Sequence, residues 1–265
     1  MNALLQAGAE QVGAQAEWDH FGIRAIEAFE RIGPWILLAS VVVLLARSLY
    51  RAHQYRTDSV LAKDAEARVH AALIDVERHT VGEVVPVVLG RSDAHPAGEW
   101  RSGLVLLVLG SALLEGVLPW HTPWLVILLQ VGLGAIGFGF ARALPGWKRM
   151  FVTEKRATEV ALEQASLEFQ RLELHRTEER TGVLLFVSLF ERRVVVLGDK
   201  GIHAKVGDAQ WARTRDAVLA GIDREGLATG LVDGIHACGE VLTKHFPVAD
   251  GDRNEVPDRL IVRAE

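Results

Sequence analysis

Two long apolar segments, joined by a very short connection, constrain this chain more than any other feature. They are "SGLVLLVLGSALLEGVLPW" at residues 102–120 and "PWLVILLQVGLGAIGFGFA" at residues 123–141. A membrane-spanning helix needs about 20 mostly apolar residues, and each segment is close to that length. Because the connection is so short, the sequence predicts a transmembrane helical hairpin within residues 101–144.

A third apolar run, "IGPWILLASVVVLLARSLY", occupies residues 32–50. Arg31 and Arg47 bracket its apolar part, as anchors at a membrane interface do. We therefore expect a further span within an N-terminal segment at residues 1–58. The alternative is a buried or interfacial helix, because apolar runs of about 10–14 residues often form one.

Basic residues indicate on which side of the membrane the soluble parts lie. The connection between the two hairpin segments has no Lys or Arg, whereas several follow the first run or flank the hairpin: Arg47, Arg51, Arg56, Arg101, Arg142, Lys148 and Arg149. Positively charged flanks stay in the cytoplasm, so both soluble parts are predicted to be cytoplasmic. The single cysteine, Cys238, fits a reducing compartment and excludes a disulfide within the chain.

The charge balance excludes one class of partner. The formal net charge is -5, and no basic stripe with interleaved aromatic residues occurs. Binding of nucleic acid would require such a stripe. The expected partners are instead the lipid bilayer and a membrane protein complex.

The soluble part before the hairpin, residues 59–91, contains one predicted helix and one predicted strand. Apolar residues recur at helical spacing up to about His79, and "GEVVPVVLG" at residues 82–90 is rich in β-branched residues. Pro86 has no N–H for a ladder, which predicts an edge position or a bulge there. One helix and one strand cannot form a core, so this part needs partners from beyond the hairpin.

Those partners are predicted in residues 150–265. A long amphipathic helix at 152–174 precedes a strand at 181–190, apolar on both faces as in a covered central strand. A second strand is expected at 194–198, followed by helices at about 209–224 and 227–245. The fold class is therefore α/β, a small sandwich of a mixed sheet with helices on both faces, interrupted by the hairpin.

The last predicted helix carries two further signals. Gly230, Gly234 and Gly239 are costly in a helix, which predicts that a neighbouring element approaches closely. Cys238 lies on its apolar stripe, so a buried structural thiol is favoured over a nucleophile.

A cation site is one interpretation of the acidic residues near the strand ends. Asp199 follows the strand at 194–198, and ligands in open α/β sheets bind at carboxyl ends of strands. Asp208, Glu255 and Asp258 could supply further oxygen ligands for Ca²⁺ or Mg²⁺. The alternatives are a tight turn at Asp199 and a helix N-cap at Asp208.

Two more patterns bear on the chemistry. Arg180 is expected to form a structural ion pair with Glu83 or with a carboxylate of the C-terminal tail, and an anion site is the alternative. "DGDRNEVPD" at residues 250–258 has acidic or amide residues at the first, third and fifth positions of an EF-hand loop. Its sixth position is Glu255 instead of Gly and its twelfth is Ile261, so an EF-hand is excluded. Ser188 has no neighbouring His and no nucleophile elbow or P-loop occurs, so no catalytic residue can be named.

Three stretches, "TVGEVVPVV", "RTEERTGVLLFVSLFERRVVVLGDKGI" and "HFPVADGDRNEVPD", resemble the TPM-domain family. The resemblance covers about residues 62–260 and is to the bacterial branch of membrane proteins in which a transmembrane hairpin interrupts the domain. It implies that the acidic run at 254–258 closes the domain. Some plant members are associated with acid phosphatase activity and some bacterial members with calcium or magnesium binding. Better-studied relatives mostly face the lumen or periplasm, unlike the cytoplasmic side predicted here.

The resemblance and the residues together give one expectation for function. We expect a multi-pass protein of the bacterial inner membrane whose TPM-like domain is a noncatalytic binding or accessory module for a membrane complex. Divalent cations, Ca²⁺ or Mg²⁺, are candidate ligands, and no other cofactor is expected. The alternative is a metal-assisted phosphatase that uses Asp199 and nearby carboxylates.

Overall fold

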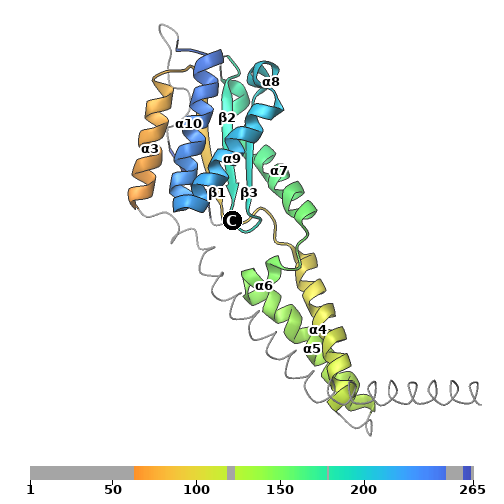
Figure 1. Ribbon diagram of the computed structural model, residues 1–265. Coiled ribbons are helices and arrows are strands. Elements are labelled where there is room, and N and C mark those ends of the chain that lie inside the picture. The colour runs from red at the N-terminus through yellow and green to blue at the C-terminus, as the bar shows by residue number, and fades with distance from the viewer. Residues whose placement is uncertain (1–62, 118–122, 178, 249–258, 264–265) are drawn as a thin grey trace, which may run out of the picture.

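The computed structural model describes residues 63–117, 123–177, 179–248 and 259–263. Within them, an α/β sandwich carries a pair of long helices that project from one end of its sheet (Figure 1). The predicted span at residues 32–50 and the acidic run at 250–258 lie outside the described residues.

The sheet has four strands in the order β3-β2-β1-β4. Strands β1 (Glu83–Leu89) and β2 (Gly182–Ser188) run parallel, β4 (Ile261–Arg263) is parallel to β1, and β3 (Arg193–Gly198) is antiparallel to β2. The predicted mixed sheet is therefore confirmed. Because β1 precedes the helix pair and β2 follows it, the sheet is assembled from both sides of that insertion.

Pro86 lies at an edge position of β1, as expected, although β1 itself has a neighbour on each side further along. The peptide groups of a parallel strand point alternately to its two neighbours. The N–H of Glu83 donates to the Thr181 carbonyl beside β2, so Pro86, three residues on, faces the β4 side. Pairing with β4 begins only at Val87, opposite Ile261. The missing N–H of Pro86 therefore falls just outside that ladder.

One face of the sheet is covered by α3 (Lys63–Glu77), α9 (Asp208–Glu225) and α10 (Leu227–His245), as Figure 1 shows. A short helix, α8 (Lys200–Val206), follows β3. The core on this face joins Leu73 of α3, Val183 and Leu185 of β2, Val218 of α9 and Ile235 of α10, all fully buried. Burial of this apolar surface is the main term that holds the helices to the sheet.

The opposite face is covered by α7 (Glu154–Arg171) and a 3-10 turn, η2 (Leu174–Arg176). Ala161 and Ala165 of α7 pack against Leu184 and Phe186 of β2. Helix α7 begins where Thr153 accepts a hydrogen bond from the Arg156 N–H, an N-cap of the usual kind. Helices thus lie on both faces, as predicted.

Close approach at the glycines of α10 is confirmed. A Cβ on Gly230 would lie 2.6 Å from the Val218 carbonyl oxygen of α9. A Cβ on Gly239 would lie 2.6 Å from Val76 of α3. Glycine at these positions lets α10 pack directly on both neighbouring helices.

The projecting helices are α4 (Pro96–Val117) and α5 (Pro123–Ala143), and the short helix α6 (Pro145–Arg149) lies at their root (Figure 1). They pack through small residues: a Cβ on Gly103 would lie 3.0 Å from the Gly134 carbonyl oxygen, and one on Gly137 would lie 2.7 Å from that of Ser102. Within the described residues, the segment Trp124–Ala143 is long and apolar enough to cross a membrane. Both predicted helices are present and pack against each other, but among the described residues only α5 meets this criterion, so a transmembrane hairpin stays a prediction.

Candidate functional site at the carboxyl end of the sheet

Polar side chains gather where β1 and β2 end and the hairpin begins. Leu89 is the last residue of β1, and residues 90–95 lead from it into α4. Ser188 is the last residue of β2, and residues 189–192 turn into β3. Ligands of open α/β sheets bind at this end of parallel strands, which makes it the first place to look for a functional site.

Glu191 is the centre of this cluster. It is 0% exposed, and both of its carboxylate oxygens accept from the Ser92 N–H, at 3.1 and 3.0 Å. His95 Nε2 donates to Oε1 at 2.6 Å, and Ser188 Oγ donates to Oε2. The loop before the hairpin and the turn between β2 and β3 are therefore tied to one buried carboxylate.

The donors around Glu191 also set its protonation. Burial by itself would raise the pKa of this carboxyl, because it penalises the charged form. Hydrogen bonds from His95, Ser188 and Ser92 favour the charged form and together hold the pKa below its usual value. Glu191 is therefore an anion at neutral pH.

The arrangement is not that of a nucleophilic serine. A catalytic serine gives its proton to a base, and a carboxylate orients that base from behind. Here Ser188 and His95 both donate to the carboxylate, and Ser92 Oγ donates to Ser188 Oγ at 2.8 Å. These groups hold Glu191 in place and do not activate a serine.

His95 is fixed from several sides. It is buried, its backbone has a φ of 50°, and its ring packs on Phe190 with ring centres 5.2 Å apart. Its Nδ1 lies 3.8 Å from the Asp93 carboxylate, which also pairs with Arg156 at 3.3 Å. A non-glycine residue in the left-handed region is strained, so the surrounding contacts must hold it there.

A second group of hydrogen bonds continues into the hairpin. Lys148 Nζ donates to the Ala94 carbonyl at 3.0 Å and to Glu99 at 2.7 Å. Trp147 Nε1 donates to Ser102 Oγ at 2.7 Å, and this hydroxyl donates to the Gly137 carbonyl of α5 at 2.7 Å. The contacts from Ser92 to Gly137, which we call the junction, therefore couple the sheet to both helices of the hairpin.

The junction was not predicted from the sequence. From the sequence, Glu191 is expected in a short polar turn, and Ser188 is expected to have no neighbouring His. In the structure Glu191 is buried and contacts both Ser188 and His95, and His95 is 96 residues from Glu191 in the chain. The one feature of the sequence that could have indicated this buried carboxylate is the position of Glu191 directly after a fully apolar strand.

Asp199 lies at the opposite end of the sheet from the position expected for it. Because β3 is antiparallel to β2, the end of β3 is beside the start of β2, and the Asp199 N–H donates to the Gly182 carbonyl at 2.9 Å. Its Oδ1 accepts a hydrogen bond from the Lys200 N–H at 2.6 Å. Helix α8 begins at Lys200, so a short helix stands where a tight turn was the alternative. Its buried Oδ2 has no hydrogen-bond partner among the described residues.

The contribution of Asp208, Glu255 and Asp258 to a cation site stays a prediction. Asp208 is the first residue of α9, and Gly207, at φ 73° and ψ 164°, is the N-cap, so the N-cap prediction for Asp208 is wrong. Glu255 and Asp258 lie outside the described residues. Among residues that are described, no three His, Cys, Asp or Glu side chains are grouped to hold a metal.

Arg180 and Glu83, the predicted ion pair, lie near the amino ends of β2 and β1. Arg180 is exposed with a φ of 53°, whereas Glu83 is buried at the start of β1. The structural pair expected from the sequence stays a prediction.

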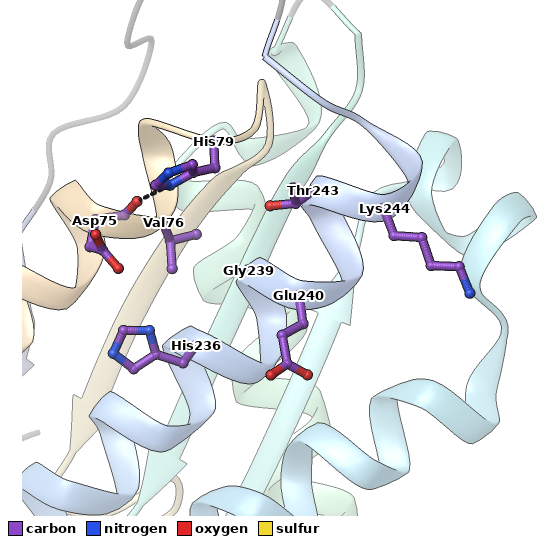
Figure 2. A pocket seen from close by; sticks show the side chains of 8 residues that line it. All are labelled: Asp75, Val76, His79, His236, Gly239, Glu240, Thr243 and Lys244. Carbon is purple, nitrogen blue, oxygen red and sulfur yellow. Dashed lines mark hydrogen bonds between the residues drawn. The ribbon is translucent and has the colours of Figure 1, made fainter.

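An open groove of about 590 Å³ lies between α3 and α10. Eight residues line it: Asp75, Val76, His79, His236, Gly239, Glu240, Thr243 and Lys244. His79 Nδ1 donates to the Asp75 carbonyl at 2.7 Å. Figure 2 shows that Glu240 and Lys244 point away from the two histidines, so the charged groups do not converge on one ligand position. The junction, not this groove, is the more organised polar site.

Fold and junction together define an α/β sandwich whose sheet carries a helical hairpin at its carboxyl end. A TPM domain is present: residues 145–241 match the model of that family. The match begins at the root of the hairpin, so it leaves out β1, which the sheet places beside β2. The expected TPM domain is thereby confirmed in its second part.

No curated protein matches this chain. Among solved structures, it is similar to the NMR structure of the BA42 protein from the psychrophilic bacterium Bizionia argentinensis, with 21% identity and a TM-score of 0.49. That similarity covers 77% of this chain and 95% of the BA42 chain.

Proposed function

We propose that this protein is a membrane-anchored, noncatalytic accessory module of the bacterial inner membrane. In this proposal α4 and α5 cross the bilayer, and the junction holds the TPM-like domain at a fixed orientation on its cytoplasmic side. The observation that carries the proposal is the apolar outer surface of the hairpin, together with the buried polar junction at the root of the same two helices.

The surface of α4 and α5 supports a membrane location. The large apolar side chains exposed on it are Leu104, Val105, Val108, Leu109, Leu125, Ile127, Leu128, Leu129, Val131 and Ile136. Water would not favour so extensive an apolar surface, whereas lipid covers it without cost. Packing through Ser102, Gly103 and Gly137 is also typical of helices in a bilayer, where small residues allow backbones to approach.

The length of α5 fits the same interpretation. Trp124, 68% exposed, lies at one end of α5, and Arg142 lies at the other. At 1.5 Å per residue the distance along the axis between them is roughly 27 Å. The hydrocarbon core of a bilayer is about 30 Å thick, so an indole and a guanidinium would reach its two interfaces.

The junction supports an accessory role over a catalytic one. It occupies the carboxyl end of β1 and β2, where open α/β enzymes bind substrates. Its carboxylate, imidazole and hydroxyl groups are directed at one another, and Glu191 is buried. A rigid attachment would hold the domain at a fixed distance from the bilayer, where it could bind a neighbouring membrane protein.

Labelling of single cysteines in intact cells tests the topology. In a Cys238→Ala background, one cysteine replaces His121 at the predicted hairpin tip, and another replaces Glu240, exposed on α10. We expect a membrane-impermeant maleimide to label position 121 from outside and position 240 only after lysis. Labelling of position 240 in intact cells, or release of the protein by alkaline carbonate, would show that the topology or the anchor is wrong.

A second candidate function is cation-dependent phosphatase activity at the amino end of the sheet. It is favoured by one observation, the buried Oδ2 of Asp199 without a hydrogen-bond partner among the described residues. We would measure the thermal midpoint of the full-length protein with EDTA, calcium and magnesium, beside Asp199→Asn. A cation at about a hundred times its dissociation constant stabilises by about 2.7 kcal/mol. A rise that Asp199→Asn abolishes, together with metal-dependent hydrolysis of a phosphomonoester, would favour the phosphatase; no response to either ion favours the accessory module.

A further inference from the structure

We propose that the root of the hairpin binds the headgroup of an anionic phospholipid through Arg101 and Arg142, beside Trp100. This proposal rests on the membrane location of the hairpin proposed above. These three side chains are here called the headgroup band; the function above uses only Arg142 among them, as an anchor at the membrane interface.

The packing of α4 against α5 places the three residues at one level. The Trp100 ring meets Phe138 of α5 edge-on, with ring centres 5.1 Å apart. One residue earlier on α4, Glu99 lies 3.8 Å from Nη1 of Arg142. Residues at the start of α4 therefore lie beside the end of α5.

The headgroup band lies at the edge of the apolar surface. The exposed apolar side chains of α4 begin at Leu104, less than one helical turn beyond Arg101. Trp100 is itself 67% exposed. In a bilayer this level is the headgroup region, where indole rings and basic side chains are enriched.

The positive charges of the headgroup band are weakly compensated within the protein. The Arg142 side chain is 73% exposed, and its acidic neighbour Glu99 already holds Lys148 Nζ at 2.7 Å. Arg101 donates to a neutral acceptor, the Phe151 carbonyl, at 3.0 Å. Two guanidinium groups thus add positive charge at the depth of the lipid phosphates.

Charge and geometry specify the class of ligand. A guanidinium presents paired N–H donors that match phosphate oxygens, and basic residues near a membrane attract anionic headgroups. The exposed indole and the adjoining apolar surface provide for the glycerol and acyl portions, which free phosphate lacks. An anionic phospholipid therefore fits the headgroup band better than an inorganic anion.

Native mass spectrometry of the full-length protein in detergent tests this site. Phosphatidylglycerol and phosphatidylcholine with identical acyl chains are the probes, and the double variant Arg101→Gln/Arg142→Gln is compared with wild type. The control is Arg213→Gln/Arg215→Gln, which removes the same charge from exposed positions of α9. We expect wild type and the control to prefer phosphatidylglycerol by roughly tenfold or more, and the double variant to lose this preference.

Three results would overturn the proposal: equal retention of the two lipids by wild type, a preference that survives in the double variant, or displacement of phosphatidylglycerol by inorganic phosphate. Alkaline carbonate extraction of membranes separates this failure from that of the anchor. If the wild type resists extraction but shows no lipid preference, only the headgroup band is refuted. If alkaline carbonate releases the wild type, the proposed membrane anchor is refuted, and the headgroup band with it. Retention of the double variant in membranes shows that it still inserts.

Discussion

His95 Nε2 lies 2.6 Å from Glu191 Oε1, and this buried contact joins the loop that enters the hairpin to the turn between β2 and β3. Both side chains are almost completely excluded from solvent. A buried carboxylate is tolerated only when its hydrogen bonds are satisfied, and here the donors come from elements on both sides of the hairpin. The orientation of the hairpin relative to the sheet therefore depends on this contact.

Removal of the Glu191 carboxylate should destabilise the domain strongly. Glu191→Ala leaves the Ser92 N–H, the Ser188 hydroxyl and the His95 ring buried without their acceptor. We expect a loss of about 3–5 kcal/mol in the free energy of unfolding, measured by urea denaturation of the detergent-solubilised protein. Glu173→Gln, which breaks the exposed pair with Arg176, is the control and should cost less than about 1 kcal/mol. Equal losses in the two variants would contradict the role given to Glu191.

Acid should weaken the same contact. The pKa of Glu191 is lower in the folded protein than the ordinary carboxyl value of 4.5, so the unfolded state binds its proton more readily. The stabilisation is therefore fully present above about pH 4.5 and is lost as the pH falls through the folded-state pKa. The measurement is the free energy of unfolding against pH for wild type and Glu191→Gln. The difference between the two should shrink in acid; a difference that stays constant with pH would contradict the prediction.

Gly230 should not tolerate a side chain. A Cβ there would lie 2.6 Å from the Val218 carbonyl oxygen and 2.9 Å from the Ile222 backbone nitrogen, and backbone atoms cannot turn aside. We expect Gly230→Ala to cost about 1–3 kcal/mol by overpacking, seen as a lower thermal midpoint. Gly139→Ala is the matched helical control, because its Cβ would have no neighbour within 4 Å in the described structure. That variant should be neutral or slightly stabilising, since alanine favours helix.

Cys238 should be unreactive in the folded protein. Burial raises the pKa of its thiol to about 12, so almost no thiolate forms at neutral pH. We expect negligible labelling by a maleimide in native detergent solution and complete labelling in urea. A Glu240→Cys variant supplies an exposed thiol on the same helix, and should gain one rapidly labelled site. Rapid labelling of the wild type would show that α10 opens readily from the sheet.

The sequence by itself determined the elements and their faces. Apolar runs with β-branched residues predicted β1 and β2, and the spacing of apolar residues predicted α3, α7, α9 and α10. The glycines of α10 indicated close packing, which the structure confirms at Gly230 and Gly239. These features depend on residues close together in the chain, so a local pattern suffices to reveal them.

Only the tertiary structure decided the order and direction of the strands, and with them the location of the polar groups. The antiparallel pairing of β3 places Asp199 at the amino end of β2, and β4 pairs with β1 only from Val87 onward, beyond Pro86. Residues 96 apart in the chain, His95 and Glu191, meet because the parallel register of β1 and β2 brings Leu89 opposite Ser188. No short-range pattern encodes such a contact, since hydrogen bonds between distant residues depend on the global register of the sheet.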